Sequence, residues 1–279
     1  MRPGAAHAAP LRLRAEFKEK IWGATSLTPW FPNPTAKTGE VWFTDPEGAA
    51  LPLLVKFLFT TEKLSVQVHP DDDFAARYES SLGKTEMWHV LRAEPGASIA
   101  LGLREPLSPE RLREVSLSGE IESLLAWRPV SAGESFFIPP GTIHAIGAGL
   151  ALCEVQQVSD VTYRLYDYGR PRELHLDKAI AVSHAVPHPG AQPHHLEPSG
   201  AELLAACRYF RVEKLRFTRP APLDPAPAVL TILEGSGTLA AGQPYQPGES
   251  FLVELPVTPL EIQPAAPTTL LRASVPVAS

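Results

Sequence analysis

The sequence predicts a mainly β protein made of two related β domains. Short apolar or alternating runs recur along the 279-residue chain, separated by turns that contain Gly or Pro, a pattern typical of a β-sandwich or a barrel. The chain has 30 Pro, which suits short strands joined by stiff turns better than long helices. Finally, Gly133-Glu134-Ser135-Phe136 recurs as Gly248-Glu249-Ser250-Phe251. Each copy precedes an apolar run, so we expect the second domain to repeat a β unit of the first.

The composition argues against several classes of protein. A formal net charge of −6 without any basic run argues against a nucleic-acid-binding surface. Cys153 and Cys207 form no CxxC pair, so neither a disulfide framework nor a cysteine-based zinc site is expected. The N-terminus lacks the apolar segment of a secretory signal, and the longest apolar run, residues 51–59, is too short to span a bilayer. We therefore expect a cytoplasmic monomer or homodimer with no nucleic-acid or membrane partner.

The first half of the chain begins as a series of strands. Residues 51–69 predict two adjacent strands that divide near residues 61–63. A short helical turn is expected over residues 74–80, because the acidic residues 71–73 favour a helix start. Residues 86–91 predict the next strand.

A helical insertion then interrupts the β pattern at about residues 105–128. Ser108-Pro109-Glu110 combines a capping residue, a proline at the first helical position and an acid in the first turn. A second short helix is expected over residues 119–127. Strands resume over residues 134–139, 150–157 and 163–170.

Residues 186–200 have the composition of a linker, with several Pro and Gly. Its three histidines could bind a metal, but the prolines hold the backbone extended and the rings need not converge, so a solvated linker is favoured. These histidines are His188, His194 and His195. We therefore divide the chain into a first domain of residues 1–190 and a second of residues 191–279. Further strands are expected over residues 209–217, 228–233 and 251–255.

The most informative stretch is Leu64-Ser65-Val66-Gln67-Val68-His69-Pro70-Asp71-Asp72. It alternates apolar and polar residues, as a half-buried strand does. Residues two apart on a strand point to the same face, so Ser65, Gln67 and His69 share one. A hydroxyl, an amide and an imidazole in line make a poor packing surface but a suitable edge for a metal or substrate site. Taken alone, the stretch is equally consistent with an exposed polar strand face.

Four residues could complete one metal site: Gln67, His69, Glu86 and His144. Two imidazoles, one carboxylate and one amide oxygen suit zinc, iron, manganese or cobalt, and they leave positions open to a substrate. Glu86 or His144 alone is more often a buried polar group with its own hydrogen-bond partner, but the joint pattern favours a metal site. When the two repeated segments are aligned without a gap, His144 falls opposite Pro259, so the second domain is expected to lack metal ligands.

The spacing from Gly133 to His144, G-x5-P-x-G-x2-H, resembles the second motif of the cupin superfamily of small β-barrels. Gln67 stands where a His is usual in cupins and Glu86 lies further downstream, and both features resemble the type I phosphomannose isomerases. Four segments resemble motifs of that family in the same order: LSVQVHPD from Leu64, GKTEMW from Gly83, IPPGTIHAIG from Ile138 and EVQQVSDVTYRLYDYGR from Glu154.

This resemblance implies two cupin-type β-barrel (jelly-roll) domains with a small helical insertion in the first, as in the compact bacterial members. The first domain would be catalytic, and the second would be degenerate. The resemblance also implies that Gln67, His69, Glu86 and His144 bind one zinc ion.

The resemblance further implies roles for residues around the metal. Arg164 matches an arginine considered catalytic, and Glu154 lines the substrate pocket. Arg170 stands where some members have Lys, and Ile146 replaces a Tyr of other members. The positions matched to the sugar-phosphate pocket are Lys56, Ser65, Lys84, Asp160 and Arg170. Lys56 is unusual on its own, because it interrupts an apolar strand where a charge is costly.

The implied reaction is the interconversion of mannose 6-phosphate and fructose 6-phosphate through an enediol. A phosphate requires converging cations and hydroxyls, which the lysines, arginines and serine of this set supply. A Lewis-acid metal stabilises the developing oxyanion, and a positioned group relays the proton. Glu154 is the candidate base, and Arg164 the candidate for oxyanion or proton-transfer assistance.

Two other functions remain open from the sequence. His69, Glu86 and His144 alone would satisfy the two-histidine-one-carboxylate iron site of a cupin oxygenase, although such substrates need no phosphate-binding cations. A non-catalytic sugar-binding cupin would keep the metal site without the reaction.

Overall fold

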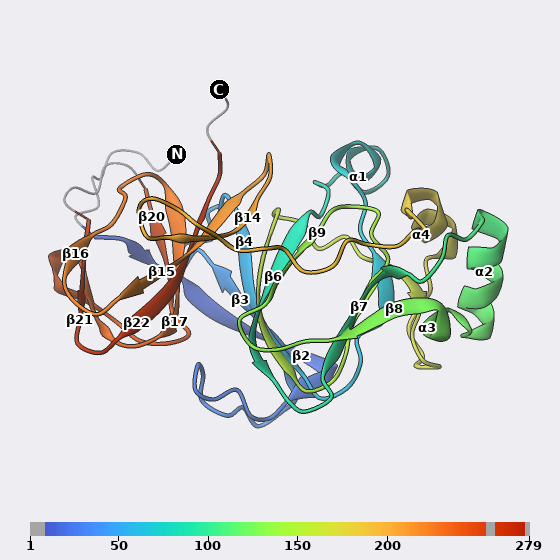
Figure 1. The fold of residues 1–279 in the computed structure, drawn as a ribbon, viewed down its shortest axis with the longest axis horizontal. Coiled ribbons are helices and arrows are strands. Elements are labelled where there is room, and N and C mark those ends of the chain that lie inside the picture. Colours follow the sequence, from blue (N-terminus) through green and yellow to red (C-terminus); the bar gives the residue numbers. More distant parts are fainter. Residues whose placement is uncertain (1–8, 255–259, 277–279) are drawn as a thin grey trace.

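The structure is a computed structural model that describes residues 9–254 and 260–276. The described residues form four antiparallel sheets and a few short helices, so the mainly β fold predicted from the sequence is confirmed. The two halves of the structure lie side by side along the long axis, with the C-terminal strands at one end and the helices α2 (Pro109–Ser118), α3 (Ile121–Leu124) and α4 (Leu176–Val182) at the other (Figure 1). No helix within the described ranges is long and apolar enough to cross a membrane.

The first half is a sandwich of two sheets. The six-stranded sheet has the order β2-β3-β4-β11-β6-β9, and the five-stranded sheet has the order β12-β5-β10-β7-β8. The strands are β2 (Arg14–Ala24), β3 (Thr38–Thr44), β4 (Leu54–Thr60), β5 (Val66–Val68), β6 (Glu86–Ala93), β7 (Ser98–Leu103), β8 (Leu125–Pro129), β9 (Ser135–Ile138), β10 (His144–Ile146), β11 (Leu150–Gln156) and β12 (Tyr163–Tyr166). One apolar cluster joins their inner faces, with Leu58 and Trp88 from the first sheet and Ile99 and Ile146 from the second.

Four helices belong to this half: α1 (Asp72–Glu79), α2 (Pro109–Ser118), α3 (Ile121–Leu124) and α4 (Leu176–Val182). α2 begins as predicted, because the Ser108 side chain accepts a hydrogen bond from the Arg111 backbone N–H and Pro109 occupies the first turn. The second helix of the insertion is shorter than expected, since Trp127 pairs with Ala100 of β7 and turns the segment into β8. Apolar residues of α2, α3 and α4 pack against the five-stranded sheet.

The second half pairs a seven-stranded sheet, β1-β20-β17-β22-β15-β14-β13, with a four-stranded sheet, β16-β21-β18-β19. The strands are β1 (Leu11–Arg12), β13 (His195–Leu196), β14 (Glu202–Ala206), β15 (Arg211–Phe217), β16 (Ala221–Pro222), β17 (Ala228–Glu234), β18 (Gly237–Leu239), β19 (Gln243–Tyr245), β20 (Ser250–Val253), β21 (Glu261–Pro264) and β22 (Thr268–Ser274), with the 3-10 helix η1 (Ala240–Gly242).

The two halves are connected more closely than a linker alone would connect them. β1 comes from the start of the chain but pairs with β20 of the second half. One apolar cluster contains Phe57 of β4 together with Phe210 and Val212 from the second half. Within residues 186–200, which we expected to be a solvated linker, β13 pairs with β14.

The repeated segments occupy equivalent places in the two halves. Ser135 pairs with His89 where β9 meets β6, and Ser250 pairs with Thr231 where β20 meets β17. In both copies the leading glycine has a positive φ, 94° in the first and 82° in the second, and donates a backbone hydrogen bond to a neighbouring strand, β6 in the first and β17 in the second. Residues Leu255 and Pro259 lie outside the described residues.

Candidate active site

His69, Glu86 and His144 form a buried group that could hold a metal ion. One ligand atom from each residue lies within 4.8 Å of the others, and each side chain is no more than 1% exposed. His69 follows β5, Glu86 begins β6, and His144 begins β10. The metal-compatible group therefore lies between the two sheets of the first half.

The hydrogen bonds of both histidines leave the same nitrogen available for a metal. The Nδ1 atoms lie 2.9 Å from backbone carbonyls, those of Val161 for His69 and Thr142 for His144. A carbonyl only accepts, so Nδ1 carries the proton and the lone pair is on Nε2. Both Nε2 atoms lie 3.6 Å from carboxylate oxygens of Glu86. Burial lowers the pKa of His144 to about 4 and that of His69 well below its usual range, so both rings are neutral near pH 7.

Gln67 completes the donor set predicted from the sequence. Its Nε2 lies 3.2 Å from His144 Nε2, and its Oε1 accepts a hydrogen bond of 3.1 Å from Ser65. An amide binds a metal through oxygen, so the ligand role requires a half-turn of the amide that brings Oε1 beside His144. The two imidazoles, the carboxylate and the amide thus fit a divalent cation by donor type and by convergence.

Two lysines and two glutamates form a buried charge cluster, and one of the glutamates is Glu86 of the metal-compatible group. Lys84 contacts Glu86 in an ion pair, and its Nζ lies 3.2 Å from His69 Nε2 and 3.5 Å from Glu154 Oε1. Lys56 Nζ lies 3.3 Å from Glu154 Oε1. The lysine in the apolar strand, which the sequence marked as unusual, is therefore paired inside the protein rather than exposed.

Within this charge cluster, the pKa values of the two carboxyl groups are shifted in opposite directions. Burial and the neighbouring Glu154 raise the pKa of Glu86 to about 7. Burial also raises the pKa of Glu154, but Lys84 and Lys56 outweigh it and lower that pKa below its usual value. Glu154 is therefore ionised near neutral pH, and Trp88 Nε1 donates to its Oε2 over 3.2 Å.

A cavity of about 250 Å³ brings most of the predicted substrate residues together. The residues predicted from the sequence that line it are Lys56, Ser65, Gln67, Lys84, Glu86, Glu154, Asp160 and Arg164. Arg164 and His144 lie opposite Gln67 from the two neighbouring strands, so these three residues form one row across β12, β5 and β10. Ile146 also lines the cavity. It is the residue that, by the resemblance drawn from the sequence, replaces a Tyr of other family members.

Arg170 is not among the lining residues. Its guanidinium binds Asp167 and the Lys63 carbonyl. Sequence reasoning gave no site role to nine further lining residues: Lys20, Trp22, Glu40, Leu58, Leu64, Trp88, Thr162, Arg172 and His175. The alternation of charge and aromatic residues on β2 is the one signal that could have indicated Lys20 and Trp22.

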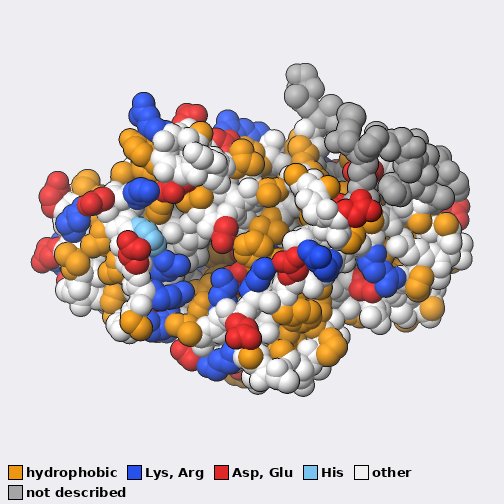
Figure 2. Space-filling view, turned by 180° about the vertical axis from the view of Figure 1, so that it is seen from behind, with side chains coloured by type: hydrophobic (Ala, Val, Ile, Leu, Met, Phe, Trp, Pro, Cys, Tyr) orange, Lys and Arg blue, Asp and Glu red, His pale blue; other side chains and the backbone are white. Residues whose placement is uncertain are grey.

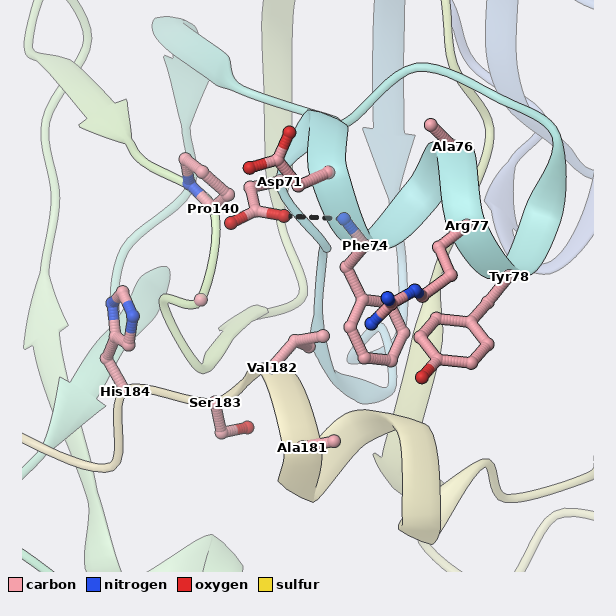
Figure 3. A pocket seen from close by; sticks show the side chains of 12 residues that line it. Asp71, Phe74, Ala76, Arg77, Tyr78, Pro140, Ala181, Val182, Ser183 and His184 are labelled. Atoms are coloured by element: carbon pink, nitrogen blue, oxygen red, sulfur yellow. Dashed lines mark hydrogen bonds between the residues drawn. The ribbon is translucent and has the colours of Figure 1, made fainter.

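A larger cavity, of about 1010 Å³, lies elsewhere on the first half. Figure 3 shows Phe74, Arg77 and Tyr78 of α1 facing Ala181 to His184, which lie at and beyond the end of α4. None of its lining residues belongs to the metal-compatible group, so we assign the chemistry to the smaller cavity. The face opposite to that of Figure 1 is hollowed near its centre, with Lys and Arg side chains around the hollow (Figure 2).

The three histidines of residues 186–200 line neither of the two cavities, and they have other partners. His188 Nε2 lies 3.0 Å from the Phe137 carbonyl oxygen, and His194 Nδ1 lies 2.5 Å from a carboxylate oxygen of Glu202. His195 lies on the exposed strand β13. Within the described part of the chain, all three lie outside the group that could hold a metal.

The fold and the buried His–Glu–His group, which could hold a metal ion, define a protein of the cupin class, although the sheets of the described residues do not close into barrels. No family model matches the sequence. The chain is 35% identical to the mannose-6-phosphate isomerase of Streptococcus mutans over 84% of its length and 88% of that protein, and 34% identical to the Bacillus subtilis enzyme over 88% and 92%. It therefore belongs to the mannose-6-phosphate isomerase family.

The solved structures agree with this assignment. The Bacillus subtilis mannose 6-phosphate isomerase superimposes with a TM-score of 0.85 at 30% identity, covering 96% of this chain and all of that one. A putative mannosephosphate isomerase from Archaeoglobus fulgidus, at 19% identity and a TM-score of 0.76, shares the fold. The cupin fold predicted from the sequence is confirmed.

Proposed function

We propose that this protein interconverts mannose 6-phosphate and fructose 6-phosphate through an enediol, with one zinc ion bound per chain. The observation that carries the proposal is that Glu86 of the buried His69–Glu86–His144 group lines one small cavity together with Glu154 and Arg164. The 35% identity to a protein named mannose-6-phosphate isomerase supports the choice of substrate.

Gln67, His69, Glu86 and His144 would hold the metal. When bound there, zinc would supply Lewis-acid stabilisation of the negative charge that develops on the substrate oxygens. The chain prepares the site for it, because both imidazoles are neutral and are held through Nδ1 by backbone carbonyls. Such contacts fix the orientation of a ligand ring.

Glu154 would move the proton between the two carbons of the substrate. In the direction of fructose 6-phosphate, its carboxylate takes the proton from C2 and returns it to C1, while the hydroxyl proton on O2 passes to O1. Its lowered pKa keeps it unprotonated near pH 7. The hydrogen bond from Trp88 and the ion pair with Lys56 fix its position.

Arg164 would stabilise the charge on the reacting oxygens, because it lies beside Gln67 in the row that crosses the site. Substrate binding is assigned to the residues predicted from the sequence that line the cavity: Lys56, Ser65, Lys84 and Asp160. A cytoplasmic location and a monomeric or homodimeric state are part of the proposal. Light scattering on the purified protein measures the state of assembly.

A coupled assay for fructose 6-phosphate formed from mannose 6-phosphate tests the reaction. Turnover of about 1–10³ s⁻¹ is expected for an enzyme acting on its own substrate. Oxygen consumption by protein loaded anaerobically with iron would indicate the oxygenase instead. Bound metal without turnover of any hexose phosphate would indicate a sugar-binding protein.

A further inference from the structure

Arg164 has a buried donor without an acceptor. Its Nε is inaccessible to water and makes no hydrogen bond in the described structure. A buried charged donor without a partner costs free energy. Arg164 lines the cavity, so the rest of its guanidinium is available to an anionic ligand there even though Nε itself is enclosed.

A second guanidinium lies at the same cavity and is held in a fixed orientation. Arg172 donates to Asp167 through two nitrogens, with Nε 2.6 Å from Oδ2 and Nη2 2.7 Å from Oδ1. This bidentate pair fixes the plane of the guanidinium. Arg172 lines the cavity together with Arg164. Desolvation and then the charge of Arg172 lower the pKa of Arg164, so the two cations are close enough to repel each other.

One carboxylate serves two arginines at this end of the cavity. Asp167, whose side chain is 2% exposed, also accepts a hydrogen bond of 2.6 Å from Arg170 Nη2. Arg170 is turned away to the Lys63 carbonyl at 2.9 Å and does not line the cavity. Asp167 therefore holds both guanidiniums in place, and Asp160 and Glu173 are the further acids whose charges act on Arg164.

A neutral donor lies beside these cations. The Nδ1 atom of His175 accepts a hydrogen bond of 3.2 Å from the backbone N–H of Arg164. Its pKa is lowered by burial and by Arg164, so the ring is neutral near pH 7. The proton of a neutral ring must then be on Nε2, and His175 lines the cavity as well.

We propose that Arg172 and His175, next to Arg164, bind the phosphate group of the substrate, and that Arg172 takes the part expected for Arg170. A phosphate dianion provides several acceptor oxygens and two negative charges, which would accept hydrogen bonds from Arg172 and His175 and relieve the repulsion between the guanidiniums of Arg172 and Arg164. Identifying the anion as the phosphate of a sugar phosphate rests on the proposed function. The existence of an anion site at this end of the cavity does not depend on that function.

The test is the binding of two probes, mannose 6-phosphate and inorganic phosphate, to the zinc-loaded protein by titration calorimetry. In Arg172→Gln both dissociation constants should rise about tenfold or more, as expected when a charge-assisted bidentate contact is lost. Arg113→Gln is the matched control, because Arg113 also pairs with an aspartate, Asp177, but lies on α2 outside the cavity. It should bind both probes as the wild type does.

Kinetics separate binding from chemistry. In Arg172→Gln the KM should rise about tenfold while kcat falls much less, and Arg172→Lys should restore part of the affinity. The proposal would be overturned if folded Arg172→Gln bound both probes with the affinity of the wild type. It would also be overturned if the variant lost kcat while its KM stayed unchanged. If Arg172→Gln does not fold, as judged by circular dichroism, Arg172→Lys decides by the same comparison of affinities.

The two proposals can fail separately. If the wild type binds inorganic phosphate through Arg172 but does not isomerise mannose 6-phosphate, the anion site stands and the proposed function falls. If it isomerises the sugar and Arg172→Gln keeps its KM, the function stands and the phosphate assignment falls.

Discussion

Lys56 and Glu154 lie opposite each other on β4 and β11, and their side chains form an ion pair of 3.3 Å although they are only 4% and 5% exposed. The register of the second half places Glu213 and Arg272 at the equivalent positions of β15 and β22, and they pair at 3.2 Å. The charges are reversed between the two halves. The repeated β unit therefore keeps an ion pair at this position, and among the described residues the pair of the first copy alone lies beside a metal-compatible group.

Glu154→Gln is expected to lower kcat by about a hundredfold or more, because an amide cannot accept the proton of the substrate. The thermal unfolding temperature should fall as well, since Lys56 loses its buried partner. A steady-state assay with melting curves measures both effects.

Glu213→Gln is the matched control for this prediction, because it breaks the equivalent pair away from the cavity. It should lower the unfolding temperature and leave kcat unchanged. Equal losses of kcat in the two variants would show that breaking a buried pair, rather than losing a base, explains the effect of Glu154→Gln.

Replacing Gln67, His69 or His144 by Ala should lower kcat by about a hundredfold or more, and the histidine variants should also lose bound metal, as loss of a ligand does. Metal content measured by mass spectrometry after dialysis checks the second effect. His89→Gln is the control, because His89 is a buried histidine of β6 that bonds Ser135 over 2.8 Å outside the metal group. A histidine variant that keeps full zinc content would remove that residue from the ligand set.

Metal binding should release a proton in a manner that depends on pH. In the metal-free protein, burial and Glu154 raise the pKa of Glu86 to about 7, whereas His144, with a pKa of about 4, is already neutral above pH 5. Ligands must be deprotonated to bind metal. About one proton should therefore leave per zinc ion bound at pH 6, and the number should fall toward zero at pH 8. Calorimetry in buffers of different ionisation enthalpy measures the number of protons released. The absence of proton release at pH 6 would contradict the raised pKa of Glu86.

The metal group could be predicted because its signals are local. Period-two alternation places Gln67 and His69 on one face, and the Gly and Pro spacing before His144 specifies a turn. Arg172 gives no such signal. It follows a turn in which Tyr168 and Gly169 have φ values of 54° and 76°, so strand alternation no longer tells which of Arg170 and Arg172 faces the cavity. Glu40 contributes from β3, whose place beside β4 is set by the packing of the whole sheet.

The most direct test of the central claim is a coupled mannose 6-phosphate isomerase assay on one preparation, run before chelation, after chelation and after zinc is added back. The account predicts that turnover disappears with the metal and returns with zinc, in step with zinc content. Full turnover in the chelated, metal-free protein, or no turnover in any metal state, would contradict it.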